Sequence, residues 1–278
     1  MSKPLFSFEF FPPQTMEGTA KLGATRKKLA ALRPEFFSVT FGAGGSTRDR
    51  TLETIEQITA EGYSAAPHLS CIGSTRENIS AILQTYKRLG IKRIVALRGD
   101  LPSGMATTGE FQYANELVSF IRAQTGEHFH IEVAAYPEFH PQARSPQDDL
   151  LNFKRKIAAG ANSAITQYFY NADSYFYFVD QCLKLGITVP IVPGIMPIMK
   201  FAQLARFSDA CGAEIPRWMR RTLESYGDDA QSIQAFGLDV VSALCERLLA
   251  GGAPGLHFYT LNQAAPTVAI WQRLGLKP

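Results

Sequence analysis

The sequence contains few cysteines, and their spacing matches no metal site or disulfide framework. There are four among 278 residues, Cys71, Cys182, Cys211 and Cys245, and no two of them form a C-x-x-C pair. Zinc modules need closely spaced ligand pairs, so we interpret these residues as separate reduced thiols in the core or on helices. The histidines and acidic residues form no convincing ligand cluster either. The sequence therefore predicts a protein without a metal site.

Long apolar runs are also missing. A membrane-spanning helix needs a stretch of about 20 apolar residues, and the sequence contains none. Near the N-terminus, Glu9 and the pair Pro12-Pro13 interrupt the apolar run before a signal-peptide core can form. We therefore expect a soluble protein of the cytoplasm with no membrane partner.

Charge of one sign is not concentrated in any segment. The 28 basic and 25 acidic residues give a net charge of +3 and are spread along the chain. A nucleic-acid-binding surface needs a concentrated basic patch, so we expect no nucleic-acid partner. Apolar residues make up 46% of the sequence and charged residues 19%, which is enough for a sizeable core and excludes general disorder.

Short β-rich runs and longer helical patterns alternate along the whole sequence. Strands are expected at residues 5–11, 36–42, 64–71, 93–99, 130–137, 163–169, 189–195 and 256–262. Helices are expected at 49–61, 75–89, 113–125, 146–159 and 173–185. Each of these helices is followed directly by a glycine, which is the usual residue just beyond a helix C-terminus.

This alternation favours parallel strands joined by right-handed crossovers. Eight such units in 278 residues predict a closed (β/α)8 TIM barrel, with residues 1–278 forming a single catalytic domain. A doubly wound open sheet is the competing fold, but it usually carries G-x-G-x-x-G after its first strand, and here that strand runs into Phe-Phe-Pro-Pro. Residues 214–235 are expected to form an extra helical excursion before strand eight.

The first strand is expected to place an acidic side chain in the mouth of the barrel. Side chains alternate along a strand, so Phe6, Phe8 and Phe10 share one face and Glu9 lies on the other. The phenylalanine face should pack under the helices. A buried, unpaired carboxyl group has a raised pKa, which would suit Glu9 to act as a general acid. A salt-bridged structural glutamate is the alternative.

Other polar residues collect at the ends of the expected strands, where barrel enzymes place their chemistry. Two motifs stand out, the glycine-rich loop after Thr40 and the sequence Arg98-Gly99-Asp100. The loop could equally be a flexible turn, a lone histidine such as His68 is more often a core residue than a ligand, and Arg98 and Asp100 could form a local ion pair. No nucleophile elbow, P-loop or H-E-x-x-H motif is present. The sequence thus offers one candidate acid and several polar residues around the strand ends, but no nucleophile. This combination points to an enzyme whose chemistry is carried by a bound cofactor.

On the helix after the fifth strand, spacing places Asp149, Asn152 and Lys156 near one face. A cationic face near a bound phosphate would explain Arg155 and Lys156, and a solvated helix face is the alternative. The amides of Gln167 and Gln203 could hydrogen-bond a heterocycle without adding charge.

Nine motifs resemble bacterial-type methylenetetrahydrofolate reductases in family order. They are FSFEFFPP at 6–13, VTFGAGG at 39–45, ALRGD at 96–100, AAYPE at 134–138, DLLN at 149–152, KRK at 154–156, GAN at 160–162, ITQ at 165–167 and HFYTLN at 257–262. The resemblance implies a TIM-barrel flavoprotein with non-covalent FAD. It implies NADH- or NADPH-dependent reduction of 5,10-methylenetetrahydrofolate to 5-methyltetrahydrofolate, by ping-pong hydride transfer, in one-carbon metabolism and methionine biosynthesis.

The resemblance also assigns roles to individual residues. Glu9 matches the general acid that assists opening of the folate's imidazolidine ring, and Asp100 matches the acid beside flavin and pterin. Cofactor contacts are implied for Thr40, Phe41, Ala43, His68, Arg98, Gly99, Asp100, Ala114, Tyr136, His140, Ala143, Asp149, Asn152, Arg155 and Lys156. Substrate contacts are implied for Asp100, Gln167, Gln203, Phe207 and Gln263.

Two positions depart from the family pattern. Phe41 stands where some members have tyrosine, and Gln263 stands where some have an arginine that contacts substrate. The chain stops soon after the eighth strand and its helix, so we expect no C-terminal regulatory domain and no inhibition by S-adenosylmethionine. Family members form dimers or tetramers, so a homo-oligomer is expected. A flavin-free folate-binding methyltransferase and a non-catalytic scaffold remain as alternatives, and the choice between NADH and NADPH stays open.

Overall fold

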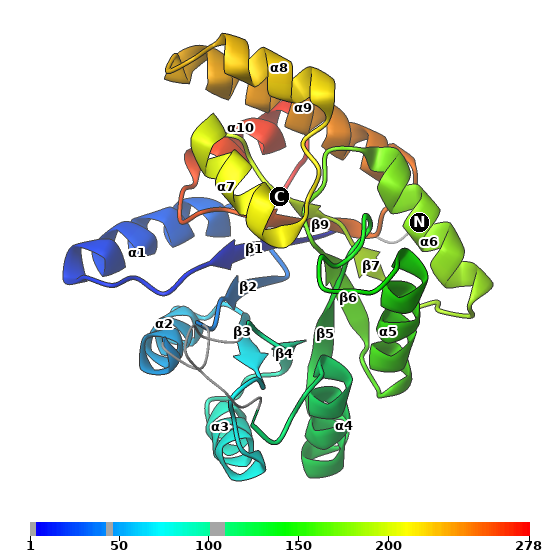
Figure 1. The fold of residues 1–278 in the computed structure, drawn as a ribbon. Coiled ribbons are helices and arrows are strands. Elements are labelled where there is room, and N and C mark those ends of the chain that lie inside the picture. Colours follow the sequence, from blue (N-terminus) through cyan, green and yellow to red (C-terminus); the bar gives the residue numbers. More distant parts are fainter. Residues whose placement is uncertain (1–3, 43–46, 101–108) are drawn as a thin grey trace.

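A computed structural model describes residues 4–42, 47–100 and 109–278. Its strands are parallel and its helices surround them in a ring that runs from α1 through α6 (Figure 1). The strands are β1 (Leu5–Phe10), β2 (Phe36–Val39), β3 (Ala65–Ser70), β4 (Arg93–Leu97), β5 (His130–Ala135), β6 (Ser163–Thr166), β7 (Ile191–Val192), β8 (Gly194–Ile195) and β9 (Gly255–Tyr259). The predicted TIM-barrel fold is confirmed.

The helices follow the strands in the expected order. They are α1 (Met16–Ala30), α2 (Arg48–Ala60), α3 (Arg76–Arg88), α4 (Ala114–Thr125), α5 (Pro146–Ala158), α6 (Ala172–Lys184), α7 (Phe201–Cys211), α8 (Arg217–Ser225), α9 (Ala230–Ala250) and α10 (Ala265–Arg273). Hydroxyl side chains begin several of them: Thr75 accepts a hydrogen bond from the backbone N–H of Asn78, and Ser145 accepts one from Asp148. Within the described residues, no helix is long and apolar enough to cross a membrane.

The predicted seventh strand is divided into two short strands at Pro193. β7 pairs with β6, whereas β8 pairs with β9. Proline has no backbone N–H and cannot donate to a strand ladder, which explains the break. The carbonyl of Pro193 still accepts a hydrogen bond of 3.0 Å from the backbone N–H of His257. Through this divided strand, the sheet connects β6 to β9, and β9 in turn pairs with β1.

The two faces of the strands bury different side chains. Phe8 and Phe10 are fully buried on the outer face and pack against Phe37 of β2, with ring centroids 6.1 Å and 5.4 Å away. A smaller apolar cluster on the inner face contains Phe36 and Ile165. The prediction for β1 is therefore confirmed: its phenylalanines pack beneath the helices.

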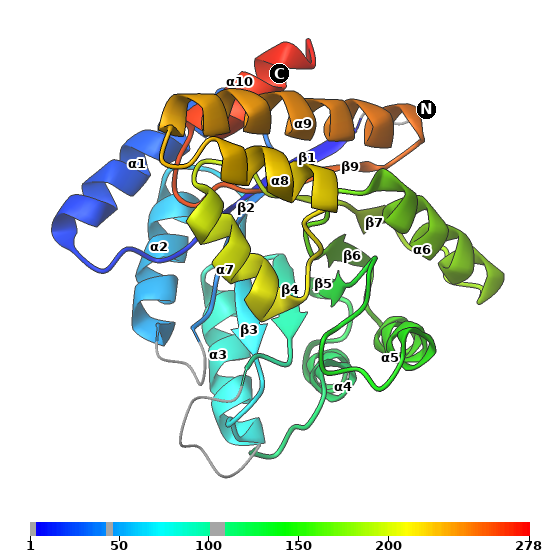
Figure 2. The same ribbon diagram turned by 45° about the horizontal axis from the view of Figure 1, so that its top comes forward.

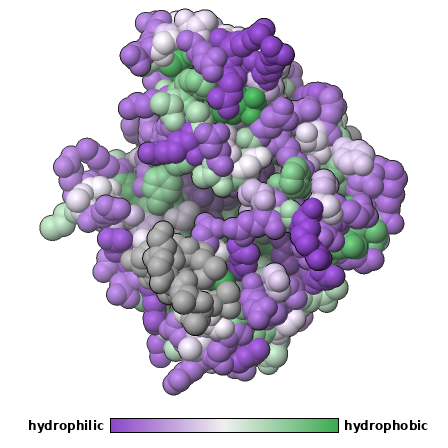
Figure 3. Space-filling model, in the orientation of Figure 1, coloured by the Kyte–Doolittle hydropathy of each residue, from purple (hydrophilic) through white to green (hydrophobic). Residues whose placement is uncertain are grey.

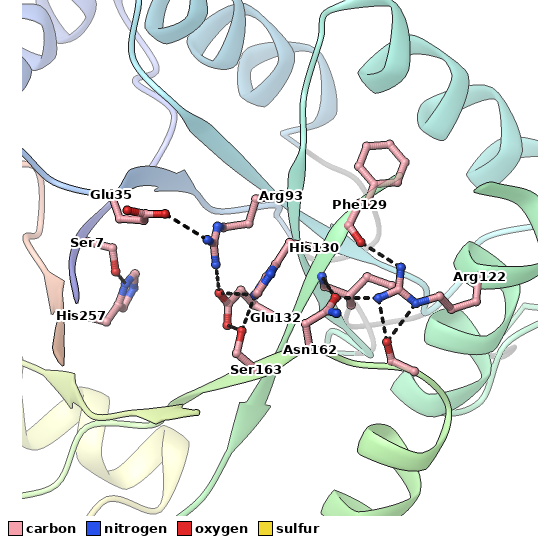
Figure 4. Close-up of polar contacts among 12 residues, drawn as sticks. Ser7, Glu35, Arg93, Arg122, Phe129, His130, Glu132, Asn162, Ser163 and His257 are labelled. Atoms are coloured by element: carbon pink, nitrogen blue, oxygen red, sulfur yellow. Dashed lines mark hydrogen bonds and ion pairs between the residues drawn. The ribbon is translucent and has the colours of Figure 1, made fainter. Parts of the chain in front are cut away.

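A polar network occupies the N-terminal ends of β4 to β6 (Figure 4). Glu132 is buried and contacts the guanidinium of Arg93, and it accepts a 2.6 Å hydrogen bond from Ser163. Burial raises the pKa of Glu132, but His130, Arg93 and Ser163 together lower it by more, so that the pKa lies below its usual value. A buried carboxylate needs such partners to remain charged. This network lies at the end of the barrel opposite the strand C-termini, so we assign it to stability.

The segment between β8 and β9 contains α7, α8 and α9. The expected excursion at 214–235 includes the whole of α8 and the first turns of α9. Helices α8 and α9 lie side by side in both ribbon views (Figure 2), and the ring centroids of Trp218 on α8 and Phe236 on α9 are 6.0 Å apart. The face shown in Figure 3 is mostly hydrophilic, with hydrophobic side chains in small groups. The extra chain length therefore forms additional helices on the barrel.

Candidate active site

The C-terminal ends of the strands surround a cleft with two parts. The larger part, about 510 Å³, lies over the strand ends and is called here the strand-end cavity. The smaller part, about 280 Å³, lies between β4, α4, β5 and α5 and is called the α4–α5 cavity. Six residues line both: Leu97, Asp100, Ala134, Tyr136, His140 and Gln142. The two cavities therefore share a wall and could hold two parts of one ligand, or two ligands in contact.

Most residues singled out from the sequence lie in this cleft. Those that line the strand-end cavity are Glu9, Thr40, Phe41, His68, Asp100, Tyr136, His140, Gln167 and Phe207. Those that line the α4–α5 cavity are Arg98, Gly99, Asp100, Ala114, Tyr136, His140, Ala143, Asp149, Asn152 and Lys156. Arg155, Gln203 and Gln263 line neither. Ala43 lies outside the described residues.

Glu9 lies at the inner end of the strand-end cavity, between two histidines. Its Oε2 atom is 3.2 Å from Nε2 of His68 and 3.3 Å from Nε2 of His257. The side chain is only 13% exposed. On its other side, the His257 ring is hydrogen-bonded to Ser7, with 2.7 Å between Nδ1 and Oγ. Because an ionised carboxylate can only accept, the Glu9 contact assigns a proton to Nε2 of His257.

The predicted ionisation of Glu9 was wrong. Burial by itself raises the pKa of Glu9, as expected from the sequence. The charge of His68 and the hydrogen bond from His257 lower it by more, so that the pKa falls to about 2. Glu9 is therefore a carboxylate at neutral pH in this structure, held by partners from β3 and β9 that the pattern of β1 alone does not reveal.

His257 and Ser7 were not singled out as site residues. The signal for His257 lies in the alternation of side chains along β9. Leu256 and Phe258 are buried on one face, whereas His257, which is also buried, and Tyr259 lie on the other face. The register pairs Ser7 with His257 across the β1–β9 ladder. That pairing depends on barrel closure, so the sequence pattern becomes informative only once β1 and β9 are known to be neighbours.

The turn after β4 is built around Gly99. Its φ of +83° is in the left-handed region, and a Cβ atom there would lie 1.8 Å from Oγ of Ser70. Ser70 in turn donates a 2.9 Å hydrogen bond to the carbonyl of Arg98. The Arg98 side chain donates to Oε1 of Gln142, and no ion pair with Asp100 occurs in the described part of the chain. Glycine is therefore required for the close approach that directs Arg98 and Asp100 into the cleft.

The face of α5 predicted from spacing is present. Asp149, Asn152 and Lys156 all line the α4–α5 cavity. Nζ of Lys156 donates a 2.5 Å hydrogen bond to the carbonyl of Ala134, and burial lowers the pKa of Lys156 to about 8 despite the opposing charge of Asp149. Arg155 is exposed and donates to Oδ1 of Asn152 instead. Of the two neighbouring cations, Lys156 is the one directed into the cleft.

His140 lies in the wall shared by the two cavities. Burial lowers its pKa, with a smaller opposing effect of Asp149. Nδ1 of His140 accepts a 3.0 Å hydrogen bond from the backbone N–H of Gln142, which assigns the proton of the neutral ring to Nε2. A neutral donor is therefore available where the two cavities meet.

The donors of the α4–α5 cavity fit a nucleotide cofactor better than a metal ion. Arg98 and Lys156 supply positive charge for a diphosphate, and the side chains of Asn152 and His140 supply neutral hydrogen-bonding groups. In residues 4–42, 47–100 and 109–278, no cluster of three or more His, Cys, Asp or Glu side chains could hold a metal. All four cysteines are free thiols. The cleft is therefore suited to an anionic, ring-containing cofactor.

Comparisons with known proteins identify the family of the chain. Residues 1–275 match the family model described as methylenetetrahydrofolate reductase. The chain is 44% identical to 5,10-methylenetetrahydrofolate reductase of Escherichia coli over 98% of its own length and 91% of that protein. It is 39% identical to a rice protein named probable methylenetetrahydrofolate reductase (NADH), over 99% of this chain and 48% of the rice protein.

Among solved structures, a Clostridium thermocellum protein described as binding two copies of 5-methyl-5,6,7,8-tetrahydrofolic acid has the same fold. The two superpose with a TM-score of 0.67 at 17% identity, over 96% of this chain and 92% of the other. That likeness concerns the fold, whereas the sequence matches extend along nearly the whole chain. The chain therefore belongs to the methylenetetrahydrofolate reductase family.

Proposed function

We propose that this chain reduces 5,10-methylenetetrahydrofolate to 5-methyltetrahydrofolate, with NADH or NADPH as the electron donor. The observation that carries the proposal is the Glu9 carboxylate, held by His68 and His257 at the inner end of a cavity of about 510 Å³. Family membership supplies the substrate class, and the cleft supplies space for it beside a second, cation-lined cavity.

FAD fits the α4–α5 cavity on the chemistry of its donors. Arg98 and Lys156 would face the diphosphate, and Asn152 would hydrogen-bond the nucleotide. When bound, FAD supplies hydride transfer in two halves, from the nicotinamide nucleotide and then to the folate, which gives ping-pong kinetics.

Glu9 is proposed to move a proton during the folate half of the reaction. Opening of the imidazolidine ring requires a proton on the departing nitrogen, and Oε2 of Glu9 is the carboxylate atom placed to pass it. Because this carboxyl group is ionised in the free protein, it must take up a proton from water before it can act as the acid. His68 and His257, whose Nε2 atoms lie within 3.3 Å of Oε2, would hold the carboxyl group in position for that transfer.

Asp100 and Gln167 are proposed to position the folate. Asp100 lines both cavities, and its negative charge would stabilise the cationic iminium that forms when the ring opens. Oε1 of Gln167 accepts a 3.0 Å hydrogen bond from the backbone N–H of Tyr168. The amide NH2 group of Gln167 is therefore the part that remains to donate to a pterin acceptor in the strand-end cavity.

Rapid mixing under anaerobic conditions tests this function. The purified protein should be yellow. Its flavin absorbance should bleach on addition of NADH or NADPH, and the absorbance should return on addition of 5,10-methylenetetrahydrofolate. Comparing the two nucleotides decides between them as donors. Colourless protein that cannot be reconstituted with FAD would overturn the proposal and favour a flavin-free folate-binding methyltransferase.

A further inference from the structure

Arg206 places a positive charge against the ring of a residue that lines the strand-end cavity. It lies on α7, is exposed, and its guanidinium carbon is 5.5 Å from the centroid of the Phe207 ring. Phe207 lines the cavity. In the described part of the chain, Arg206 takes part in no ion pair. A cation held against the cavity wall is therefore available to a ligand.

The wall of the strand-end cavity has the opposite charge. Its lining contains the carboxylates of Glu9, which is paired with His68, and of Asp100, and its described lining includes no lysine or arginine. An anionic group inside would be repelled by Asp100, most strongly where water is excluded. A ligand with a neutral or cationic ring and an anionic tail would gain most by placing the ring inside and the tail outside.

We infer that Arg206 binds the glutamate carboxylates of the folate substrate, an inference that rests on the proposed function. The pteridine must reach Glu9 at the inner end, so the glutamate trails toward the rim. A guanidinium presents a planar fork that matches a carboxylate with two hydrogen bonds. Gln263, like Arg206, is exposed and is not among the lining residues of either cavity, but it carries no charge. Arg206 is thereby a specificity residue for the anionic tail of the substrate.

Arg220 provides a matched control. Its guanidinium carbon lies 5.9 Å from the centroid of the Phe201 ring, so it makes the same kind of contact as Arg206. Phe201 lines neither cavity. Replacing either arginine by glutamine removes one cation stacked on a phenylalanine, but only Arg206→Gln removes one from a phenylalanine that lines the strand-end cavity.

The test compares two substrates that differ only in the glutamate. One is 5,10-methylenetetrahydrofolate and the other is the corresponding pteroate, which ends at the aminobenzoate. For Arg206→Gln, we expect the KM of the glutamate-bearing substrate to rise about two- to fivefold, the size of one exposed charged pair. The KM of the pteroate and the rate of flavin reduction by the nicotinamide nucleotide should stay unchanged. Arg206→Lys should recover part of the loss, and Arg220→Gln should match the unaltered protein.

A binding measurement separates this inference from the proposed function. Calorimetry with 5-methyltetrahydrofolate and with its pteroate counterpart should show the same selective loss for Arg206→Gln. An equal loss for both ligands, or an equal effect of Arg220→Gln, would overturn the role of Arg206 while folate reduction persists. If the unaltered protein binds the folate but does not reduce it, the proposed function fails, and the binding comparison still decides the role of Arg206.

Discussion

Nε2 of His257 lies 3.3 Å from Oε2 of Glu9, although 248 residues separate them in the chain. The contact exists because β1 and β9 are neighbours in the barrel, with Ser7 opposite His257 and Glu9 opposite Tyr259. His257 is fully buried, so its polar groups must be satisfied by these neighbours. Together with His68 on β3, a residue from the other end of the sequence thus keeps Glu9 ionised.

Replacing Glu9 by glutamine should separate the two halves of the proposed reaction. General acid catalysis contributes about 10²- to 10⁴-fold, so Glu9→Gln should slow folate reduction by that factor. Flavin reduction by the nicotinamide nucleotide should be retained, because it needs no proton from Glu9. Stopped-flow absorbance measures both halves. Glu17→Gln, on the exposed face of α1, is the control, and undiminished folate turnover in Glu9→Gln would rule out the proton role.

The same substitution should change the acid dependence of stability. The pKa of Glu9 is about 2 in the folded chain and about 4.5 when exposed, so its carboxylate stabilises the fold above the higher value. That contribution is lost as the pH falls from about 5 toward 2. Urea unfolding across this range should show a steeper loss in free energy of unfolding for the unaltered protein than for Glu9→Gln. Parallel curves would contradict the low pKa.

Gly99 should not tolerate a side chain. In Gly99→Ala, the new Cβ would meet Oγ of Ser70 at 1.8 Å, in addition to the strain of a left-handed backbone at φ +83°. Gly62 has nearly the same φ of +82° but has no atom within 4 Å of its Cβ position. Gly62→Ala should therefore cost about 1 kcal/mol, from the strain alone.

The difference in free energy of unfolding between Gly99→Ala and Gly62→Ala measures the effect of the steric clash with Ser70. Gly99→Ala should lose about 2 kcal/mol more in thermal or urea unfolding, because the turn must shift away from Ser70. The same shift should weaken retention of FAD. Equal stability losses in the two variants would show that the turn after β4 can move without cost.

Lys156 should make cofactor binding depend on pH above neutrality. Burial lowers the pKa of Lys156 to about 8, so its positive charge is lost as the pH rises through that value. The affinity for FAD should therefore fall between about pH 7 and 9 in the unaltered protein. Lys156→Met should bind about ten- to a hundredfold more weakly at neutral pH, as expected for the loss of one charged hydrogen bond, and should lack this pH dependence. Equilibrium dialysis measures the affinity.

Lys154→Met serves as the control for Lys156→Met. Lys154 is exposed on the same helix and lines neither cavity, so its loss should leave FAD affinity within about twofold, typical of an exposed charge. If both variants lose the same affinity, the net charge of α5 matters rather than the placement of Lys156.

Local pattern was enough to predict the barrel and some residues of the cleft, and the family resemblance supplied the others. Alternation placed Phe8 outward and Glu9 in the cavity, and helical spacing placed Asp149 and Lys156 on one face. Helical spacing did not show that Lys156 enters the cleft while its neighbour Arg155 is exposed. The direction of the Lys156 side chain depends on the Ala134 carbonyl to which it donates, and that carbonyl belongs to another element. The pKa of Glu9 was predicted in the wrong direction because its partners lie on β3 and β9. The break at Pro193 depends on which neighbours each half of that strand finds.

The pairing of β1 with β9 also determines when the site can exist. A chain synthesised from its N-terminus produces Glu9 among the first residues and His257 among the last. Closing a loop between residues this distant in sequence carries an entropic cost that local pairings do not. The Glu9–His257 contact therefore depends on the same pairing that closes the barrel, and a nascent chain lacking β9 would have Glu9 but no His257 beside it.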